Sequence, residues 1–247
     1  MRNEALTGYL LHQRPYQEKR ALYYLFSQQY GVVHGIGKKG APLFEQLQLF
    51  ATGKRDLKTF SQINLVSSDN DETSIVETDP LRYQQIRGQQ QYAALYLNEI
   101  LWKLLPSEDP MPVLWQHYRD SLLQLKQPLT ANALRLCLRQ FEYYLFQELG
   151  FGLTLAHDNM LAPIEPEAVY RFLPDAGFMP IVQADETTID SLQSVFSGAQ
   201  IIEMERLGIA KTTLDNWSKL HRYLIDHLLD YQPLQSRLLW QQQQRYQ

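Results

Sequence analysis

The first 66 residues combine short apolar and aromatic runs with closely spaced turn residues. Pro, Gly and charged residues separate five such runs, and each run is the length of a strand rather than of a helix. Short strands with tight connections are typical of a small barrel. The five expected strands cover residues 7–14, which end at Pro15, and residues 19–27, 31–37, 43–51 and 57–66.

The pattern changes after residue 66. Residues 67–80 (SSDNDETSIVETDP) are polar and acidic and indicate a linker, and from Leu81 apolar positions recur at helical spacing. This spacing predicts an α+β chain in which a barrel and its linker occupy residues 1–80 and a mainly α-helical domain occupies residues 81–247. The expected helices cover residues 92–105, 113–126, 130–149, 188–197 and 211–229, with a short hairpin or extended insert near 168–182.

Charge divides the chain at the same place. Residues 1–66 hold nine Lys or Arg against four Asp or Glu, a balance of +5, whereas the whole chain has a net charge of −4. The remaining residues therefore carry a balance of −9. A small basic segment followed by an acidic remainder suggests a polyanion-binding domain joined to a domain with a different role.

Candidate catalytic chemistry is sparse. The single cysteine, Cys137, excludes an intramolecular disulfide and a Cys-rich zinc site, and we interpret it as a buried apolar residue. The six histidines follow no metal-binding spacing, and GIGKKG (Gly35–Gly40) lacks the spacing of a phosphate-binding loop. We therefore expect no enzyme activity, no metal and no cofactor. Without a secretory signal or a membrane span, we expect a cytoplasmic protein.

Two carboxylates fall inside helices that should be buried, where a charge needs a partner. Glu99 lies in the expected helix 92–105, and we predict a hydrogen-bond network with a neighbouring arginine. Glu142 follows Arg139 by three residues, a spacing that predicts an ion pair along one helix.

The basic segment also carries interleaved aromatic residues. Single-stranded nucleic acid is held by cations along its backbone and by aromatic faces for its bases, and this segment offers both. The alternative is that the aromatic side chains fill the barrel and that the loop charges are solvated. The candidate DNA-binding residues are Arg14, Lys19, Arg20, Tyr23, Lys38, Lys39, Lys54 and Arg55.

Several segments, in order, resemble the bacterial DNA repair family RecO. They are GYLLHQRPYQEKRALYYLFSQQYGVVHGIGKKG (8–40), ALYLNEILWKLLPSEDPMPVLWQHYRDSLLQL (94–125) and LRQFEYYLFQELGFGLTL (138–155), with weaker similarity at 169–178 and 233–240. The resemblance implies an N-terminal OB-fold and a helical C-terminal domain. It implies binding to single- and double-stranded DNA, strand annealing, contact with single-stranded DNA-binding protein (SSB) and RecR, and loading of RecA in the RecF pathway.

Two departures from this family bear on its implied properties. Many relatives hold a four-cysteine zinc cluster after the third segment, whereas residues 156–167 here contain no cysteine, so zinc is not expected. The family's Lys-Gly loop is often followed by a basic run, but Gly40–Pro42 is neutral, which suggests weaker DNA contact through this loop.

The resemblance also places an SSB-tail pocket in the helical domain, where an arginine would bind the terminal carboxylate of the acidic tail. Arg135 and Arg139 are the candidates, with the closer match at Arg139, and pairing with Glu99 or Glu142 is their alternative role. A second hypothesis for the whole chain is a protein-interaction adaptor whose DNA binding is incidental.

Overall fold

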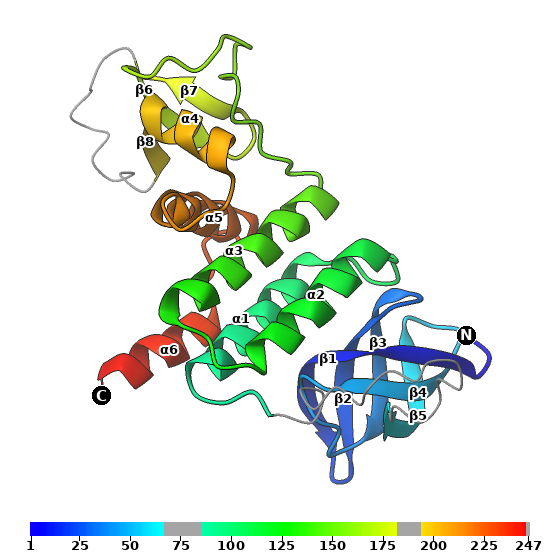
Figure 1. Cartoon of the computed structure of the whole chain (residues 1–247). Coiled ribbons are helices and arrows are strands. Elements are labelled where there is room, and N and C mark those ends of the chain that lie inside the picture. Colours follow the sequence, from blue (N-terminus) through cyan, green and yellow to red (C-terminus); the bar gives the residue numbers. More distant parts are fainter. Residues whose placement is uncertain (67–84, 182–193, 246–247) are drawn as a thin grey trace, which may run out of the picture. The chain divides into compact units, whose positions relative to one another are not determined.

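A computed structural model describes residues 1–66, 85–181 and 194–245 (Figure 1). The chain forms two compact units, which we call unit 1 (residues 1–129 and 234–247) and unit 2 (residues 130–233). The first two helices after the barrel thus group with the barrel. The expected linker, residues 67–80, lies outside the described residues, and the expected domain boundary at residue 80 stays a prediction.

Unit 1 contains the five-stranded barrel expected from the sequence, drawn in blue to cyan in Figure 1. The strand order β1-β2-β3-β5-β4 closes on itself, with β3 and β5 parallel and the other pairs antiparallel, as in an OB-fold. The strands are β1 Glu4–Gln17, β2 Arg20–Ser27, β3 Gly31–Lys38, β4 Gln46–Thr52 and β5 Leu57–Leu65.

Strand β1 continues past Pro15, where the sequence predicted that it would end. Pro15 lies opposite Ala21 of β2, and the register shifts between Pro15 and Gln17. On its other side β1 pairs with β4 only as far as Tyr9. The outer half of β1 is therefore an edge, where a proline that lacks an N–H donor is tolerated.

Alternate residues of the strands fill the barrel. On β2, Ala21, Tyr23 and Leu25 point inward and are buried, whereas Leu22 and Tyr24 between them are half-buried on the outer face. This alternation with a period of two residues is what a sheet with one packed face requires. The buried barrel core is Leu6, Leu10, Ala21, Tyr23, Leu25, Val33, Leu47, Leu49, Ala51 and Phe60.

Three helices complete unit 1: α1 Gln89–Leu104, α2 Pro112–Leu125 and α6 Gln235–Arg245. Asn98 of α1 donates hydrogen bonds of 3.1 Å to the carbonyls of Leu10 and Leu11, where the β1 register shifts. Tyr118 of α2 donates to the Asn98 side chain over 2.5 Å. These buried bonds tie both helices to the barrel.

The partner of Glu99 differs from the expected arginine. The Glu99 carboxylate accepts hydrogen bonds from the backbone N–H groups of Gln235 and Ser236 and from the Ser236 hydroxyl, and it pairs with Lys103. Burial alone would raise the pKa of Glu99, but these bonds outweigh it and lower the pKa. Glu99 is thus an anionic partner for the first N–H groups of α6, which explains a charge inside a buried helix.

Unit 2 contains α3 Ala131–Glu148, a small sheet and two further helices. Thr130 caps α3, and the β6–β7 hairpin lies in the insert expected near 168–182. The sheet has the order β7-β6-β8. The remaining elements are β6 Val169–Leu173, β7 Gly177–Pro180, β8 Val195–Ser197, α4 Gly198–Leu207 and α5 Leu214–Leu228.

The helix expected over 188–197 is wrong where the structure describes it. Residues 188–193 lie outside the described residues, but Val195–Ser197 forms a strand that pairs with β6. Ser197 then accepts a hydrogen bond from the Gln200 N–H and begins α4 in a capping box. Ser197, the last residue of the expected helix, is therefore the cap of the next helix.

No described helix combines the length and apolar character needed to cross a lipid bilayer.

Candidate nucleic-acid interface

The barrel loops carry two groups of exposed cations. Arg20 of β2 lies opposite Lys38 of β3, and the Lys39 ammonium donates to the Glu18 carbonyl in the β1–β2 turn. The first group therefore collects at one end of the β1–β2–β3 sheet, and we call it the hairpin cations. Its members are Lys19, Arg20, Lys38 and Lys39, all exposed.

The second group, Lys54 and Arg55, belongs to the β4–β5 loop and is also exposed. The strand that follows begins at Leu57, which pairs with His34 in the middle of β3. Lys38 lies four residues beyond His34, about 13 Å along the strand. The fold therefore separates the candidate cations into two groups. The outer face of β1–β2–β3 lies between these groups.

Lys58 belongs to neither group. Its side chain is buried, forms an ion pair of 2.6 Å with Glu108, and donates to the Arg55 carbonyl. One of the nine basic residues within residues 1–66 is therefore neutralised within the fold. The positive charge at the surface of this segment is smaller than the sequence count suggests.

Arg14 lies on the face between the two groups. Its Nε donates to Nε2 of His12 over 3.3 Å. Its guanidinium carbon lies 5.8 Å from the ring centroid of Trp102 and 6.0 Å from that of Tyr24. Arg14 is exposed, so this arginine presents a positive charge among aromatic rings.

The stacking role expected for Tyr23 does not fit the structure. Its side chain is 0% exposed in the barrel core, and its hydroxyl donates to the Lys38 carbonyl over 2.7 Å. The neighbouring Tyr24 points outward instead. Both faces of β2 are apolar, so the sequence pattern did not show which tyrosine faces outward.

Four half-buried rings lie together on the outer face, and we call them the ring cluster: His12, Tyr24, His34 and Trp102. The first three are cross-strand neighbours, with centroid distances of 5.5 Å for His12–Tyr24 and 4.5 Å for Tyr24–His34. Trp102 of α1 stacks on His12 at 4.8 Å with an angle of 15° between the rings. Burial lowers the pKa of His12 and of His34, so both rings are neutral at pH 7.

Sequence reasoning missed most of the ring cluster. Tyr24 belongs to the interleaved aromatic residues of the basic segment, but no sequence pattern distinguishes His12 and His34 from ordinary histidines, and Trp102 falls in a helix that is expected to be buried. The register of the β1–β2–β3 sheet brings His12, Tyr24 and His34 together. The sequence pattern did not reveal this register, which decides which side chains face outward.

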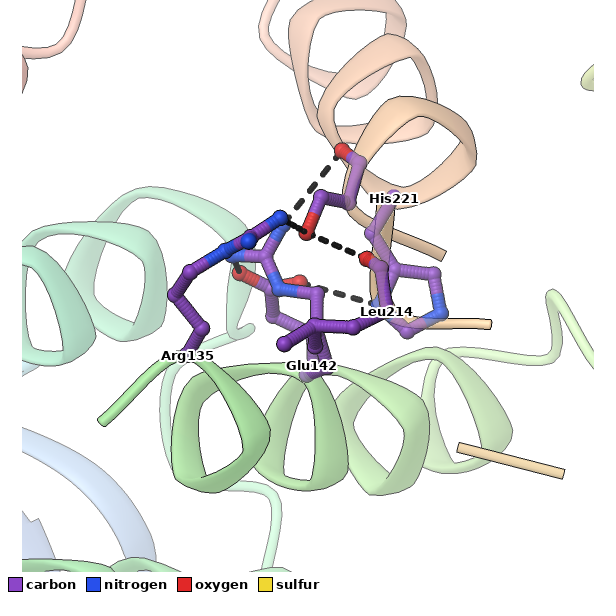
Figure 2. A network of polar contacts seen from close by, with 6 residues as sticks. Arg135, Glu142, Leu214 and His221 are labelled. Carbon is purple, nitrogen blue, oxygen red and sulfur yellow. Dashed lines mark hydrogen bonds and ion pairs between the residues drawn. The ribbon is translucent and has the colours of Figure 1, made fainter. Parts of the chain in front are cut away.

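The two arginines considered for partner binding, Arg135 and Arg139, lie on α3 in unit 2, and Figure 2 labels Arg135. Arg135 is 42% exposed and pairs with Asp215 at 2.5 Å, and it also donates to the Ser218 hydroxyl. Arg139 is only 12% exposed, pairs with Glu142 at 2.5 Å, and donates to the Ser218 carbonyl. The ion pair expected between Arg139 and Glu142 is thus confirmed, and Arg135 is the more accessible of the two.

Glu142 also joins α3 to α5. Figure 2 shows the Glu142 side chain directed from α3 toward His221, whose Nδ1 lies 2.9 Å from Glu142 Oε2. Both side chains are 0% exposed. Burial lowers the pKa of His221, although Glu142 acts in the opposite direction, so the imidazole is neutral at pH 7. Unit 2 therefore contains a buried Arg139–Glu142–His221 network.

A neutral buried histidine makes the stability of unit 2 depend on pH. Since the folded-state pKa of His221 lies below its ordinary value of 6.5, the unfolded chain takes up the proton first as the pH falls. We expect the contribution of His221 to the free energy of unfolding to be fully present above pH 6.5 and to decrease as the pH falls toward the folded-state pKa. Urea unfolding between pH 7.5 and 5.5 measures this slope.

The matched control for this experiment is the variant His221→Asn, which keeps a side-chain donor without a group that titrates. Its unfolding free energy should depend less on pH than that of the wild type, whatever its absolute stability. Equal slopes for the two proteins would show that His221 does not control the acid sensitivity.

The helical part of the chain matches a known protein family. Residues 88–237 match the family described as "Recombination protein O C terminal". The chain belongs to the RecO family. Among similar proteins, the DNA repair protein RecO of Pseudomonas paraeruginosa (strain DSM 24068 / PA7) is 35% identical over 208 residues, which cover 81% of this chain and 78% of that protein.

Two further RecO proteins extend the comparison. The DNA repair protein RecO of Stutzerimonas stutzeri (strain A1501) is 33% identical over 204 residues, covering 80% of this chain and 76% of that protein. The DNA repair protein RecO of Coxiella burnetii (strain RSA 331 / Henzerling II) is 29% identical over 244 residues, covering 94% and 95%. The similarity to RecO therefore includes the barrel as well as the helices.

Among the residues that the structure describes, no group of three or more His, Cys, Asp and Glu side chains is arranged to hold a metal ion. Cys137 is buried, as expected of an apolar residue.

Proposed function

We propose that this RecO protein is a non-enzymatic recombination mediator of the RecF pathway. It binds single- and double-stranded DNA, anneals complementary strands, docks on SSB and works with RecR to load RecA. One observation carries the DNA-binding part of the proposal: exposed cations occupy both the β1–β2 and the β4–β5 loops of the barrel. In OB-folds these two loops and the strand face between them bind oligonucleotides.

The positions of the cations suit a nucleic-acid backbone. The hairpin cations and the Lys54–Arg55 pair flank the outer face of β2 and β3, so a strand crossing that face would meet positive charge at both ends. Phosphate contacts of this kind release counterions and do not depend on base sequence. Two strands held on one cationic surface repel each other less, which favours annealing.

Docking on the SSB tail is the second part of the proposal, and Arg135 is its best-placed residue. Asp215, which forms the ion pair with the Arg135 guanidinium, is 89% exposed. A terminal carboxylate from an acidic tail could replace an exposed aspartate at little energetic cost, because exposed ion pairs contribute about 0–1 kcal/mol. Arg139 holds α3 against α5 beside this position, and its own pairing with Glu142 makes it a positioning residue.

The two parts together place the protein on SSB-coated DNA in the cytoplasm, at the nucleoid, without a metal or cofactor. The alternative is an adaptor that binds proteins and contacts DNA only incidentally. An adaptor would show DNA affinity near background, so direct binding measurements separate the two hypotheses.

Charge reversal tests the DNA-binding part. We expect the double variants Lys38→Glu/Lys39→Glu and Lys54→Glu/Arg55→Glu to weaken binding to labelled single strands of every sequence alike. Each lost phosphate contact should reduce the slope of log affinity against log salt by about 1. Fluorescence anisotropy titrations at several salt concentrations measure both quantities.

Arg206→Glu/Lys211→Glu, which reverses two exposed cations of unit 2, is the control with the same change in net charge. If a variant with all four barrel substitutions binds single strands as tightly as the wild type at low salt, the cation assignment is wrong. DNA affinity of the wild type near background would favour the adaptor.

Substitution of Arg135 tests the proposed docking on the SSB tail. We expect Arg135→Ala to weaken binding of an SSB tail peptide by roughly tenfold, about 1.4 kcal/mol. Asp215→Asn should strengthen binding, because it removes the competing carboxylate. The same peptide ending in a carboxamide is the control and should bind weakly to all three proteins. Unchanged peptide affinity in Arg135→Ala would remove the clamp assignment.

A further inference from the structure

The outer face of the barrel between the two cation groups is unusually apolar. Solvent-facing positions of an antiparallel sheet are normally polar. Here rings and aliphatic side chains occupy most of these positions, and Leu57, at the start of β5, is 46% exposed. The two outward cross-strand rows are His12–Tyr24–His34–Leu57 and Arg14–Leu22–Ile36–Thr59.

The helices cover the two ends of this face to different extents. At the other end of the same face, where α1 and α2 pack on the barrel, the outward Tyr9 and Phe26 are fully covered. The Tyr9 ring lies 5.7 Å from that of Trp115, and the Trp115 indole N–H donates to the Phe26 carbonyl. The ring cluster lies just beyond that packed region, where Trp102 of α1 stacks on His12. All four of its rings stay half-buried, so packing within the fold covers them only in part.

We propose that the ring cluster binds the unpaired bases of single-stranded DNA by stacking, and that Trp102 of α1 is part of this binding surface. The proposal rests on the proposed DNA binding of the barrel. Bases of a strand whose phosphates contact the flanking cations would lie over Tyr24 and Trp102. The surface therefore joins the barrel to a helix of the RecO C-terminal region, within unit 1.

Charge around the rings favours an anionic occupant. Arg14 lies 5.8 Å and the Lys103 ammonium 5.7 Å from the centroid of Trp102. Arg14 is exposed and close enough to contact a phosphate beside a stacked base, whereas Lys103 is the ion-pair partner of Glu99. The neutral His12 and His34 add ring faces without charge. Bases within a duplex are already stacked on each other, so this surface distinguishes unpaired from paired strands.

Abasic DNA separates base stacking from phosphate contact. The probes are a thymidine oligonucleotide, an abasic oligonucleotide of the same length, and a duplex. Stacking on aromatic side chains changes affinity by about 5- to 150-fold per base, so the wild type should bind the thymidine strand more tightly than the abasic strand by at least the lower figure.

Variants then assign the effect to residues. Tyr24→Ala and Trp102→Ala should each weaken binding of the thymidine strand about fivefold or more, while affinity for the abasic strand and the duplex stays within about twofold. Tyr24→Phe and Trp102→Phe should retain most of the affinity, because they keep a ring. Tyr231→Ala, which removes an exposed tyrosine of unit 2, is the control.

The outcomes distinguish this inference from the proposed function. Equal binding of thymidine and abasic strands by the wild type would overturn base stacking but leave cationic DNA binding intact. Equal losses for both strands in the alanine variants would also overturn it. Background affinity for all three probes would instead contradict the proposed function. If an alanine variant unfolds, the wild-type comparison of the two strands and the phenylalanine variants still decide.

Discussion

Replacing Glu142 with alanine is expected to lower the free energy of unfolding by about 3–5 kcal/mol. Glu142 is 0% exposed and pairs with Arg139 at 2.5 Å, and its Oε2 lies 2.9 Å from Nδ1 of His221. Removing the carboxylate leaves the nearly buried Arg139 guanidinium without its anionic partner, and uncompensated buried charge is costly. Urea unfolding followed by circular dichroism measures the change.

Asp215→Ala is the matched control for Glu142→Ala. It also removes the carboxylate of an arginine ion pair, but Asp215 is 89% exposed, so we expect a loss of less than about 1 kcal/mol. The double variant Arg139→Met/Glu142→Leu should be more stable than Glu142→Ala, because it leaves no unpaired charge. A loss below 1 kcal/mol for Glu142→Ala would show that the network does not hold α3 to α5.

The second large effect concerns Asn98, which joins α1 to the barrel. We expect Asn98→Leu to destabilise the protein by about 2–4 kcal/mol. The substitution keeps the side-chain volume but removes the donor to the Leu10 and Leu11 carbonyls and the acceptor for the Tyr118 hydroxyl. Burial raises the pKa of Tyr118 well above its ordinary value, so the phenol is a donor throughout the physiological range.

Tyr118→Phe provides the comparison for Asn98→Leu. It removes one donor and leaves both barrel carbonyls bonded to Asn98, so its cost should be smaller, about 1 kcal/mol. Chemical denaturation of both variants beside the wild type gives the difference. If Asn98→Leu costs no more than Tyr118→Phe, the bonds to the β1 carbonyls do not stabilise unit 1.

Local patterns predicted the barrel strands and the helices α1, α2, α3 and α5, but not α4 or α6. The turn residues that separate the apolar runs placed all five barrel strands, and the helices α1, α2 and α3 begin and end close to the expected residues. The i,i+3 spacing of Arg139 and Glu142 predicted their ion pair, because both side chains lie on one helix. These features depend only on residues close together in the sequence.

Contacts between distant residues were not predictable in the same way. Glu99 finds its partners at the N-terminus of α6, 136 and 137 residues downstream, and Glu142 meets His221 79 residues away. Neither pairing leaves a local signal. Ser197 was misassigned because a capping serine and a polar helix residue look alike until the strand before it is known.

The candidate site shows the same division. The candidate cations at the turns are exposed, since charged side chains at turns are seldom buried without a partner, whereas Lys58 in β5 is buried and paired with Glu108. Their role in DNA binding stays a prediction. The choice between Tyr23 and Tyr24 required the register of β2 with its neighbours. Trp102 required the packing of α1 against the barrel, which no spacing in the sequence reveals.

The central claim is that DNA binds the outer face of the barrel, and lysine footprinting tests it most directly. The protein is acetylated with and without a saturating single-stranded oligonucleotide at low salt, and each lysine is quantified by mass spectrometry. We expect protection of Lys19, Lys38, Lys39 and Lys54, with no protection of the exposed Lys211 of unit 2. Protection of Lys211 with the four barrel lysines unchanged would contradict it.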